Sequence, residues 1–190
     1  MPKVRASAEF SKKLRHKVSP HELDFIMLAY RLSKYGHRDQ TRDGGERYFE
    51  HPKAVALILI DELQIYDAEM IIAALLHDLK EDTWMLEWRD IELIFGARVR
   101  ELVHMLTKEP ESSTKEKAEY LERIVVASED ARLIKLADRL HNVRTLSSCG
   151  PAKQARYLEE TREFFIPLAR ATHPYLAEQI EKACAKITEQ

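Results

Sequence analysis

Length, composition and charge limit the classes of protein that this chain can represent. With 190 residues, 45% of them hydrophobic and 33% charged, the chain is expected to form one globular domain and not a disordered protein. No apolar run approaches the roughly 18 residues of a membrane span, and Cys149 and Cys184 are too few for a disulfide framework. We therefore expect a cytoplasmic protein without a membrane partner.

The charge pattern argues against binding to long nucleic acids. The net charge is −2, whereas proteins that bind DNA or RNA usually carry a basic excess that neutralises phosphates. Residues 1–18 are the exception, and we expect them to form a basic, solvated and partly frayed N-terminal arm, with a transit peptide or a nucleic-acid arm as alternatives. Residues 19–190 are then expected to form a single domain.

The pattern of caps and breakers predicts a chain of helices. Ser19 and Pro20, with Glu22 three residues after Ser19, form a capping box that starts a helix ending near Gly36. A polar segment with two glycines follows at 38–50 and predicts a loop. Further helices are expected at 52–59, 67–79, 87–95, 99–106, 114–127, 130–149, 151–172 with a kink at Pro167, and 174–187. No segment alternates with the period of a strand, so the predicted fold is all-α, a globular multi-helix array with no significant sheet.

Acidic residues gather where the apolar helix at 67–79 ends. Residues 71–76 are apolar on every face, which predicts a helix that is buried all round. His77 and Asp78 follow directly, and Glu81 and Asp82 follow one turn later. The negative end of a helix dipole disfavours carboxylates, so this cluster favours a bound cation over the alternative of a helix that surfaces into solvent.

Two other segments carry polar residues that are typical of binding sites. In the helix at 130–149, Asp138, Asn142 and Thr145 share one face, although a solvated face is the plainer interpretation. The loop at 42–52 has Arg42 before a glycine pair and His51 at its end, so it could cradle an anion or form an ordinary surface turn.

Histidine and carboxylate side chains from these three segments together predict a metal site. Imidazole nitrogens and carboxylate oxygens without thiolates suit Mn²⁺, Fe²⁺, Mg²⁺ or Zn²⁺ in an open catalytic geometry. The candidate ligands are His51, His77, Asp78 and Asp138.

The motifs resemble those of the HD phosphohydrolase superfamily, and within it the hydrolase domain of RelA/SpoT-type alarmone enzymes. The matching blocks are H-D-x-x-E-D at 77–82, R-x-x-G-E-x-Y-x-x-H-P at 42–52 and I-K-L-A-D-R-L-H-N-V-R-T-L at 134–146. The resemblance extends over about residues 20–172. It implies an enzyme that hydrolyses the ribose 3′-pyrophosphate of (p)ppGpp, and the length of the chain suggests a stand-alone small alarmone hydrolase.

The resemblance also implies roles for individual residues. His51, His77, Asp78 and Asp138 would hold one divalent cation, normally Mn²⁺ in this family. Glu81 and Asp82 would be the catalytic carboxylates. The nucleotide would be contacted by Arg42, Asn142 and Thr145. This small-molecule substrate is the one partner for which we expect a defined site, and the sequence leaves open whether the chain forms a homo-oligomer.

The base and two other functions stay open at this point. Asp43 stands where Lys is frequent in the family, and Gly44 stands where Ser is frequent, so the substrate could be (p)ppGpp or (p)ppApp. The alternatives are an HD-superfamily nucleotidase or dNTP triphosphohydrolase, and a non-catalytic nucleotide-binding module.

Overall fold

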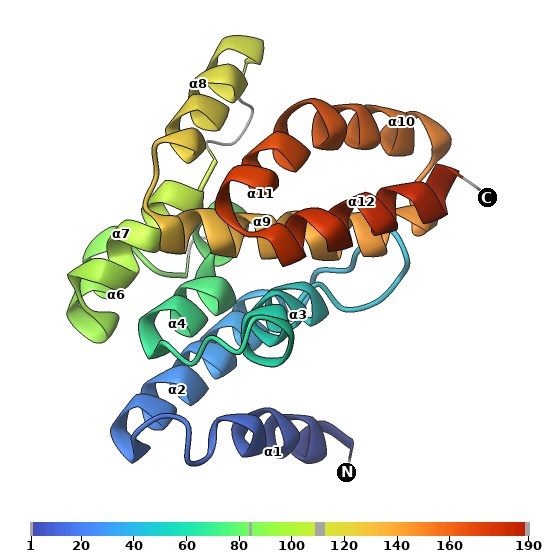
Figure 1. Cartoon of the computed structure of the whole chain (residues 1–190). Coiled ribbons are helices and arrows are strands. Elements are labelled where there is room, and N and C mark those ends of the chain that lie inside the picture. The colour runs from blue at the N-terminus through green and yellow to red at the C-terminus, as the bar shows by residue number, and fades with distance from the viewer. Residues whose placement is uncertain (1, 84, 109–112, 189–190) are drawn as a thin grey trace.

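The structure, a computed structural model, describes residues 2–83, 85–108 and 113–188, with the side chains of residues 2–5, 82 and 114 left out. Within this part of the chain every regular element is helical, and only two isolated bridges, Arg15 with Val18 and Thr41 with Arg47, resemble β-structure. The prediction of an all-α fold without a significant sheet is therefore confirmed (Figure 1).

The helices differ in length, as expected for an array and not for a regular bundle. Three short non-α segments, a π-helix at Ile58–Glu62, a 3-10 helix at Leu146–Ser148 and a π-helix at Thr161–Phe165, join neighbouring helices. The α-helices are α1 (Pro2–Leu14), α2 (Pro20–Gly36), α3 (Glu50–Leu57), α4 (Ala68–Leu76), α5 (Leu79–Asp82), α6 (Trp88–Phe95), α7 (Ala97–Leu106), α8 (Thr114–Val125), α9 (Glu129–Arg144), α10 (Pro151–Glu160), α11 (Ile166–Thr172) and α12 (Pro174–Thr188).

Local capping explains where several of these helices begin. The Ser19 side chain accepts from the backbone N–H of Glu22, and the Glu22 carboxylate accepts from the backbone N–H of Ser19, so the predicted capping box is present at α2. Asp67 caps α4 by accepting from the Met70 N–H at 2.9 Å. These bonds satisfy backbone donors that a helix start leaves unpaired.

Helices α4 and α9 form the centre of the molecule. All residues of α4 except Glu69 are buried, as its apolar sequence predicts. Helix α9 contacts α3, α4, α7, α11 and α12, and it runs through the middle of the array in Figure 1. Side chains on these two helices therefore lie in the most constrained part of the fold, which is suitable for holding a site in a fixed geometry.

The basic N-terminal segment is not a solvated, frayed arm. It contains helix α1, and the side chains of Phe10 and Leu14 are 2% and 0% exposed. The ring of Phe10 lies 5.1 Å from the ring of Tyr30 on α2. Because burial of two large apolar side chains stabilises the docked helix, the expectation of a solvated arm is wrong. The division into residues 1–18 and 19–190 remains a prediction.

Two predicted helix ends and one predicted kink differ from the structure. Helix α4 ends at Leu76, and a turn at His77 and Asp78 separates it from α5. Helix α9 ends at Arg144, five residues earlier than expected. The expected kink at Pro167 is a π-helical turn followed by a new helix, α11, which has Pro167 in its first turn, where no N–H is needed.

None of the helices in the described part of the chain is both long and apolar enough to span a membrane.

Candidate active site

Four side chains from three parts of the fold converge beside α9. His51 lies in the first turn of α3, His77 and Asp78 form the turn between α4 and α5, and Asp138 lies in the middle of α9. Helices α3 and α4 both contact α9, which brings the three segments together. His77 is the C-cap residue of α4 and Asp78 is the N-cap residue of α5.

The distances between these side chains are those of a metal site. His51 Nε2 lies 3.0 Å from Asp138 Oδ1 and 3.4 Å from Asp78 Oδ2, and His77 Nε2 lies 3.1 Å from Asp78 Oδ1. One ligand atom each from His51, His77 and Asp138 lie within 4.8 Å of one another. Asp78 is outside that group of three, but its two oxygens contact both imidazoles. Its role as a ligand remains a prediction.

The hydrogen bonds of the imidazoles point their Nε2 atoms at the site. His77 Nδ1 lies 2.8 Å from the carbonyl oxygen of Ala74, which leaves Nε2 as the lone-pair nitrogen when the ring is neutral. This Nε2 atom is buried and has no hydrogen-bond partner among the described residues. An unpaired buried nitrogen that faces two carboxylates fits a cation ligand better than a structural role.

His51 is oriented in the same way by His141. The two Nδ1 atoms are 2.8 Å apart. When His51 donates this hydrogen bond from its Nδ1–H and His141 accepts it, the lone pair of the His51 ring is on Nε2. Burial, with electrostatic contributions from His51 and Arg42, lowers the pKa of His141 to about 3. His141 is therefore neutral at physiological pH, which allows one neutral ring to accept from the other.

Burial and charge act in opposite directions on the two aspartates. Burial favours the protonated form of Asp138, but the ammonium of Lys135, whose Nζ is 2.8 Å from Oδ2, and the two imidazoles hold the Asp138 pKa well below its usual range. Burial also opposes ionisation of Asp78, while His77 and His51 lower its pKa. Both carboxylates are thus anionic and ready to bind a cation.

The loop between α2 and α3 connects to this centre through hydrogen bonds. Arg42 Nη2 donates to Asn142 Oδ1 at 2.6 Å and to Thr145 Oγ1 at 3.4 Å. Asn142 Nδ2 in turn donates to Asp138 Oδ1 at 2.5 Å. The backbone reverses at Gly45, which has φ +80, a conformation that favours glycine. The three predicted nucleotide contacts therefore lie together, next to a candidate metal ligand.

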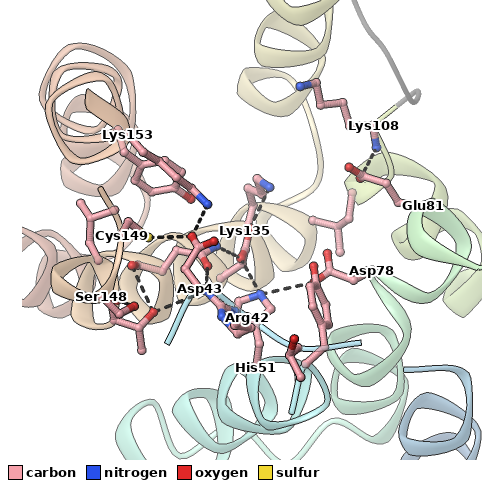
Figure 2. Close-up of a pocket in the computed structure, with 18 of the residues that line it drawn as sticks. Arg42, Asp43, His51, Asp78, Glu81, Lys108, Lys135, Ser148, Cys149 and Lys153 are labelled. Atoms are coloured by element: carbon pink, nitrogen blue, oxygen red, sulfur yellow. Dashed lines mark hydrogen bonds and ion pairs between the residues drawn. The ribbon is translucent and has the colours of Figure 1, made fainter. Parts of the chain in front are cut away.

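A cavity of about 330 Å³ contains these groups (Figure 2). At one end lies the Arg42 loop, and at the other end lies Glu81, whose Oε2 accepts from the backbone N–H of Lys108 at 3.0 Å. His51 and Asp78 line the middle of the cavity. Glu81 thus shares the cavity with three of the four candidate metal ligands, His51, Asp78 and Asp138. The side chain of Asp82 lies outside the described residues.

Three further residues at this site were not predicted. Tyr48 donates to Asp78 Oδ2 at 3.1 Å, and Lys135 carries the positive charge next to Asp138. At the rim, Lys153 Nζ donates to Asp43 Oδ2 at 2.5 Å. Tyr48 and Lys135 stand inside the motifs at 42–52 and 134–146, which was the available signal. No sequence signal pointed to Lys153, because only the fold brings this residue next to Asp43.

Comparison with known proteins agrees with this geometry. Residues 29–172 match the HD domain family, and the chain belongs to this family. The bifunctional (p)ppGpp synthase/hydrolase SpoT of Escherichia coli K12 is 43% identical over 151 residues, which cover 76% of this chain and 21% of that protein. A GTP pyrophosphokinase of Myxococcus xanthus is 40% identical over 158 residues, which cover 78% of this chain and 20% of that protein.

A solved structure gives the same result in three dimensions. It is described as a metazoan ortholog of SpoT that hydrolyzes ppGpp and plays a role in starvation responses. The alignment has a TM-score of 0.78 at 28% identity and covers 85% of this chain and 94% of that one. The resemblance to RelA/SpoT-type proteins is confirmed, and this chain spans about a fifth of the length of the curated relatives that it matches.

Proposed function

We propose that the protein is a metal-dependent hydrolase that removes pyrophosphate from the ribose 3′ position of an alarmone nucleotide such as (p)ppGpp. The observation that carries this proposal is the hydrogen-bonded chain from Arg42 through Asn142 to Asp138. It couples a cationic loop, suited to a nucleotide, directly to the candidate metal centre. The named activities of SpoT and its metazoan ortholog support the same substrate.

His51, His77, Asp78 and Asp138 would hold one divalent cation, and we propose Mn²⁺. The mixture of imidazole nitrogens and carboxylate oxygens, without a thiolate, suits this ion. When bound, such an ion polarises a phosphoryl oxygen and lowers the pKa of water. Tyr48, Lys135 and Asn142 each donate to one of the two aspartates and would keep those carboxylates in place.

Other residues of the cavity would bind the nucleotide and activate the attacking water. The guanidinium of Arg42 would bind the nucleotide, with Asn142 and Thr145 holding that guanidinium in position. Glu81 would accept a proton from the attacking water through its carboxylate, which the Lys108 N–H holds at 3.0 Å. Asp82, the second candidate catalytic carboxylate, would assist in orienting that water.

The reaction would be a displacement at the phosphorus that is attached to the ribose O3′. A bond forms between the water oxygen and this phosphorus while the bond from phosphorus to O3′ breaks. The electron pair goes to O3′, which takes up a proton, and the products are pyrophosphate and the 5′-phosphorylated nucleoside, GDP or GTP from a guanine substrate and ADP or ATP from an adenine one.

Asp43 lies where it could contact the base of the nucleotide, and its carboxylate is compatible with both guanine and adenine. Its Oδ2 atom accepts from Lys153 and lies 2.9 Å from the Cys149 Sγ at the rim of the cavity. The hydrogen bonds from Cys149 and Lys153, and the positive charge of the Lys153 ammonium, lower the pKa of Asp43 and keep it anionic. A carboxylate at this rim could accept from the amino and imino groups of guanine or from the amino group of adenine.

The direct test is to incubate the protein with Mn²⁺ and, separately, ppGpp, ppApp and a deoxynucleoside triphosphate. The proposal predicts pyrophosphate and an intact 5′-diphosphate from at least one of the first two. Cleavage of the 5′ chain, or of the deoxynucleotide alone, would support the triphosphohydrolase alternative. Binding of the nucleotides without turnover would support a non-catalytic nucleotide-binding module.

A further inference from the structure

A second cavity opens from the catalytic end of the first one. Its volume is about 490 Å³, and it lies between α8, α9 and α10. The two cavities share Glu81, Lys108, Tyr120, Lys135 and Tyr157 as lining residues. The second cavity is thus a continuation of the first, and it begins where Glu81 and Lys135 stand.

The lining of this second cavity is strongly basic. Its five cationic side chains face two carboxylates, those of Glu81 and Glu160. The five are Lys108, Lys117, Lys135, Arg139 and Arg156. A concave surface with such an excess of positive charge concentrates anions.

Part of this positive charge is not neutralised by the protein. Glu160 is shared between Lys117 and Arg139, whose Nη2 lies 2.7 Å from Oε2. Arg156 is exposed and forms no ion pair with any residue in the described part of the chain. Arg139 is 4% exposed, and its Nε atom has no hydrogen-bond partner among the described residues. The guanidinium of Arg139 is held against the rings of Tyr157 and Phe165, at 4.0 and 3.6 Å from their centroids, so it adds a fixed positive charge to the wall of the cavity.

The order of side chains along the two cavities determines which part of a bound nucleotide would enter the second cavity. The Arg42 loop lies at one end, the candidate metal ligands lie in the middle, and Glu81 and Lys108 lie at the far end (Figure 2). A nucleoside held near Arg42, with its 3′ phosphorus at the metal ligands, would direct the distal phosphate past Lys135. That direction leads into the second cavity.

We propose that the second cavity is a binding site for the distal phosphate of the substrate's 3′-pyrophosphate, and that it retains inorganic pyrophosphate after cleavage. This inference rests on the proposed function, because it assigns one end of the same substrate. Arg156 and Lys117 are the specificity-determining residues, since their cations face the cavity from α10 and α8. Nucleotides with a 3′-diphosphate are then preferred over those with a 3′-monophosphate.

The test compares Arg156→Gln and Lys117→Gln with Lys115→Gln, a matched control on the same helix as Lys117, whose side chain is 85% exposed. Titration calorimetry with inorganic pyrophosphate, in the presence of Mn²⁺, measures the affinity of each protein. Loss of one charge-assisted hydrogen bond weakens binding about tenfold. We expect that loss for Arg156→Gln and Lys117→Gln, and wild-type affinity for Lys115→Gln.

Steady-state kinetics distinguish this inference from the proposed function. With ppGpp, the KM of Arg156→Gln and Lys117→Gln should rise about tenfold, whereas their affinity for GDP should stay at the wild-type value. Equal losses for GDP and pyrophosphate, or unchanged pyrophosphate binding in both variants, would overturn the assignment of the second cavity. Failure of the wild type to cleave ppGpp would overturn the proposed function, while the pyrophosphate titration would still report on the cavity.

Discussion

Replacing His77 with alanine tests the metal centre without relying on activity. Mn²⁺ that binds only the folded protein adds stability of RT ln(1 + [Mn²⁺]/Kd), which is about 2.7 kcal/mol at 100 times the Kd. For a chain of this size 1 kcal/mol corresponds to about 2–4 °C in Tm. The wild type should therefore gain about 5–11 °C at that Mn²⁺ concentration.

The variant should lose nearly all of this gain. His77 supplies one of the three ligand atoms that lie within 4.8 Å of one another, and its Nε2 forms no hydrogen bond with the described residues. If the affinity falls a hundredfold, the same Mn²⁺ concentration adds only about 0.4 kcal/mol, or about 1–2 °C. Without metal, His77→Ala also removes the bond to the Ala74 carbonyl, worth about 1 kcal/mol. The comparison is thus between Mn²⁺-induced shifts and not between absolute Tm values.

The assay is thermal unfolding followed by circular dichroism, with and without Mn²⁺. The control is His104→Ala, which removes an exposed imidazole on α7 and should keep the full shift. A full Mn²⁺-induced shift in His77→Ala would refute the assignment of this histidine. The same loss in His104→Ala would show that the shift does not arise from the candidate centre.

The other predictions concern the nucleotide, the catalytic carboxylates and one ion pair outside the site. Arg42→Ala should raise the KM for every active nucleotide about tenfold or more, because a charge-assisted contact is lost; an unchanged KM in steady-state assays would remove Arg42 from the site. Glu81→Gln and Asp82→Asn should retain Mn²⁺ by metal analysis and lower kcat by about 10²-fold or more, whereas normal turnover in both would exclude them as catalytic groups. Burial opposes ionisation of Asp67, but the hydrogen bonds from Arg98 lower the pKa of this carboxyl group below its usual value. The ion pair therefore stabilises the fold fully above the usual carboxyl pKa, and this stabilisation is lost as the pH falls through the lower pKa of the folded state. Asp67→Asn should then reduce the free energy of unfolding by about 0.5 kcal/mol at neutral pH, and the difference, measured by urea denaturation across pH, should vanish in acid; a constant difference would contradict this account.

The helices were predictable where their signals are local. The Ser19 capping box and the Asp67 cap act within one turn of their own helix, so the sequence contains the whole interaction. The apolar run at 71–76 likewise required a buried helix whatever its neighbours are. By contrast, the docking of α1 depends on Phe10 and Leu14 finding a surface on the rest of the fold, and the many basic residues of that segment hid these two positions.

The candidate site, like the helices, was predictable where its residues are neighbours in the sequence and not where they meet only through packing. The chemistry of a helix that is followed directly by His77 and Asp78 is visible in the sequence, because carboxylates at a helix C-terminus need a cation. The residues that orient the side chains of the site are not visible in the sequence. His141 contacts His51, and Lys153 contacts Asp43, only because helices distant in sequence pack together. The second basic cavity has the same origin, because its side chains come from separate helices that no motif connects.

The measurement that tests the central claim most directly is hydrolysis of ppGpp in water enriched in ¹⁸O, with Mn²⁺ present. If water attacks the phosphorus attached to O3′, mass spectrometry should find one ¹⁸O atom in the released pyrophosphate and none in the GDP. Label in the nucleotide, release of orthophosphate, or no turnover by the wild type would contradict 3′-pyrophosphate hydrolysis at this centre.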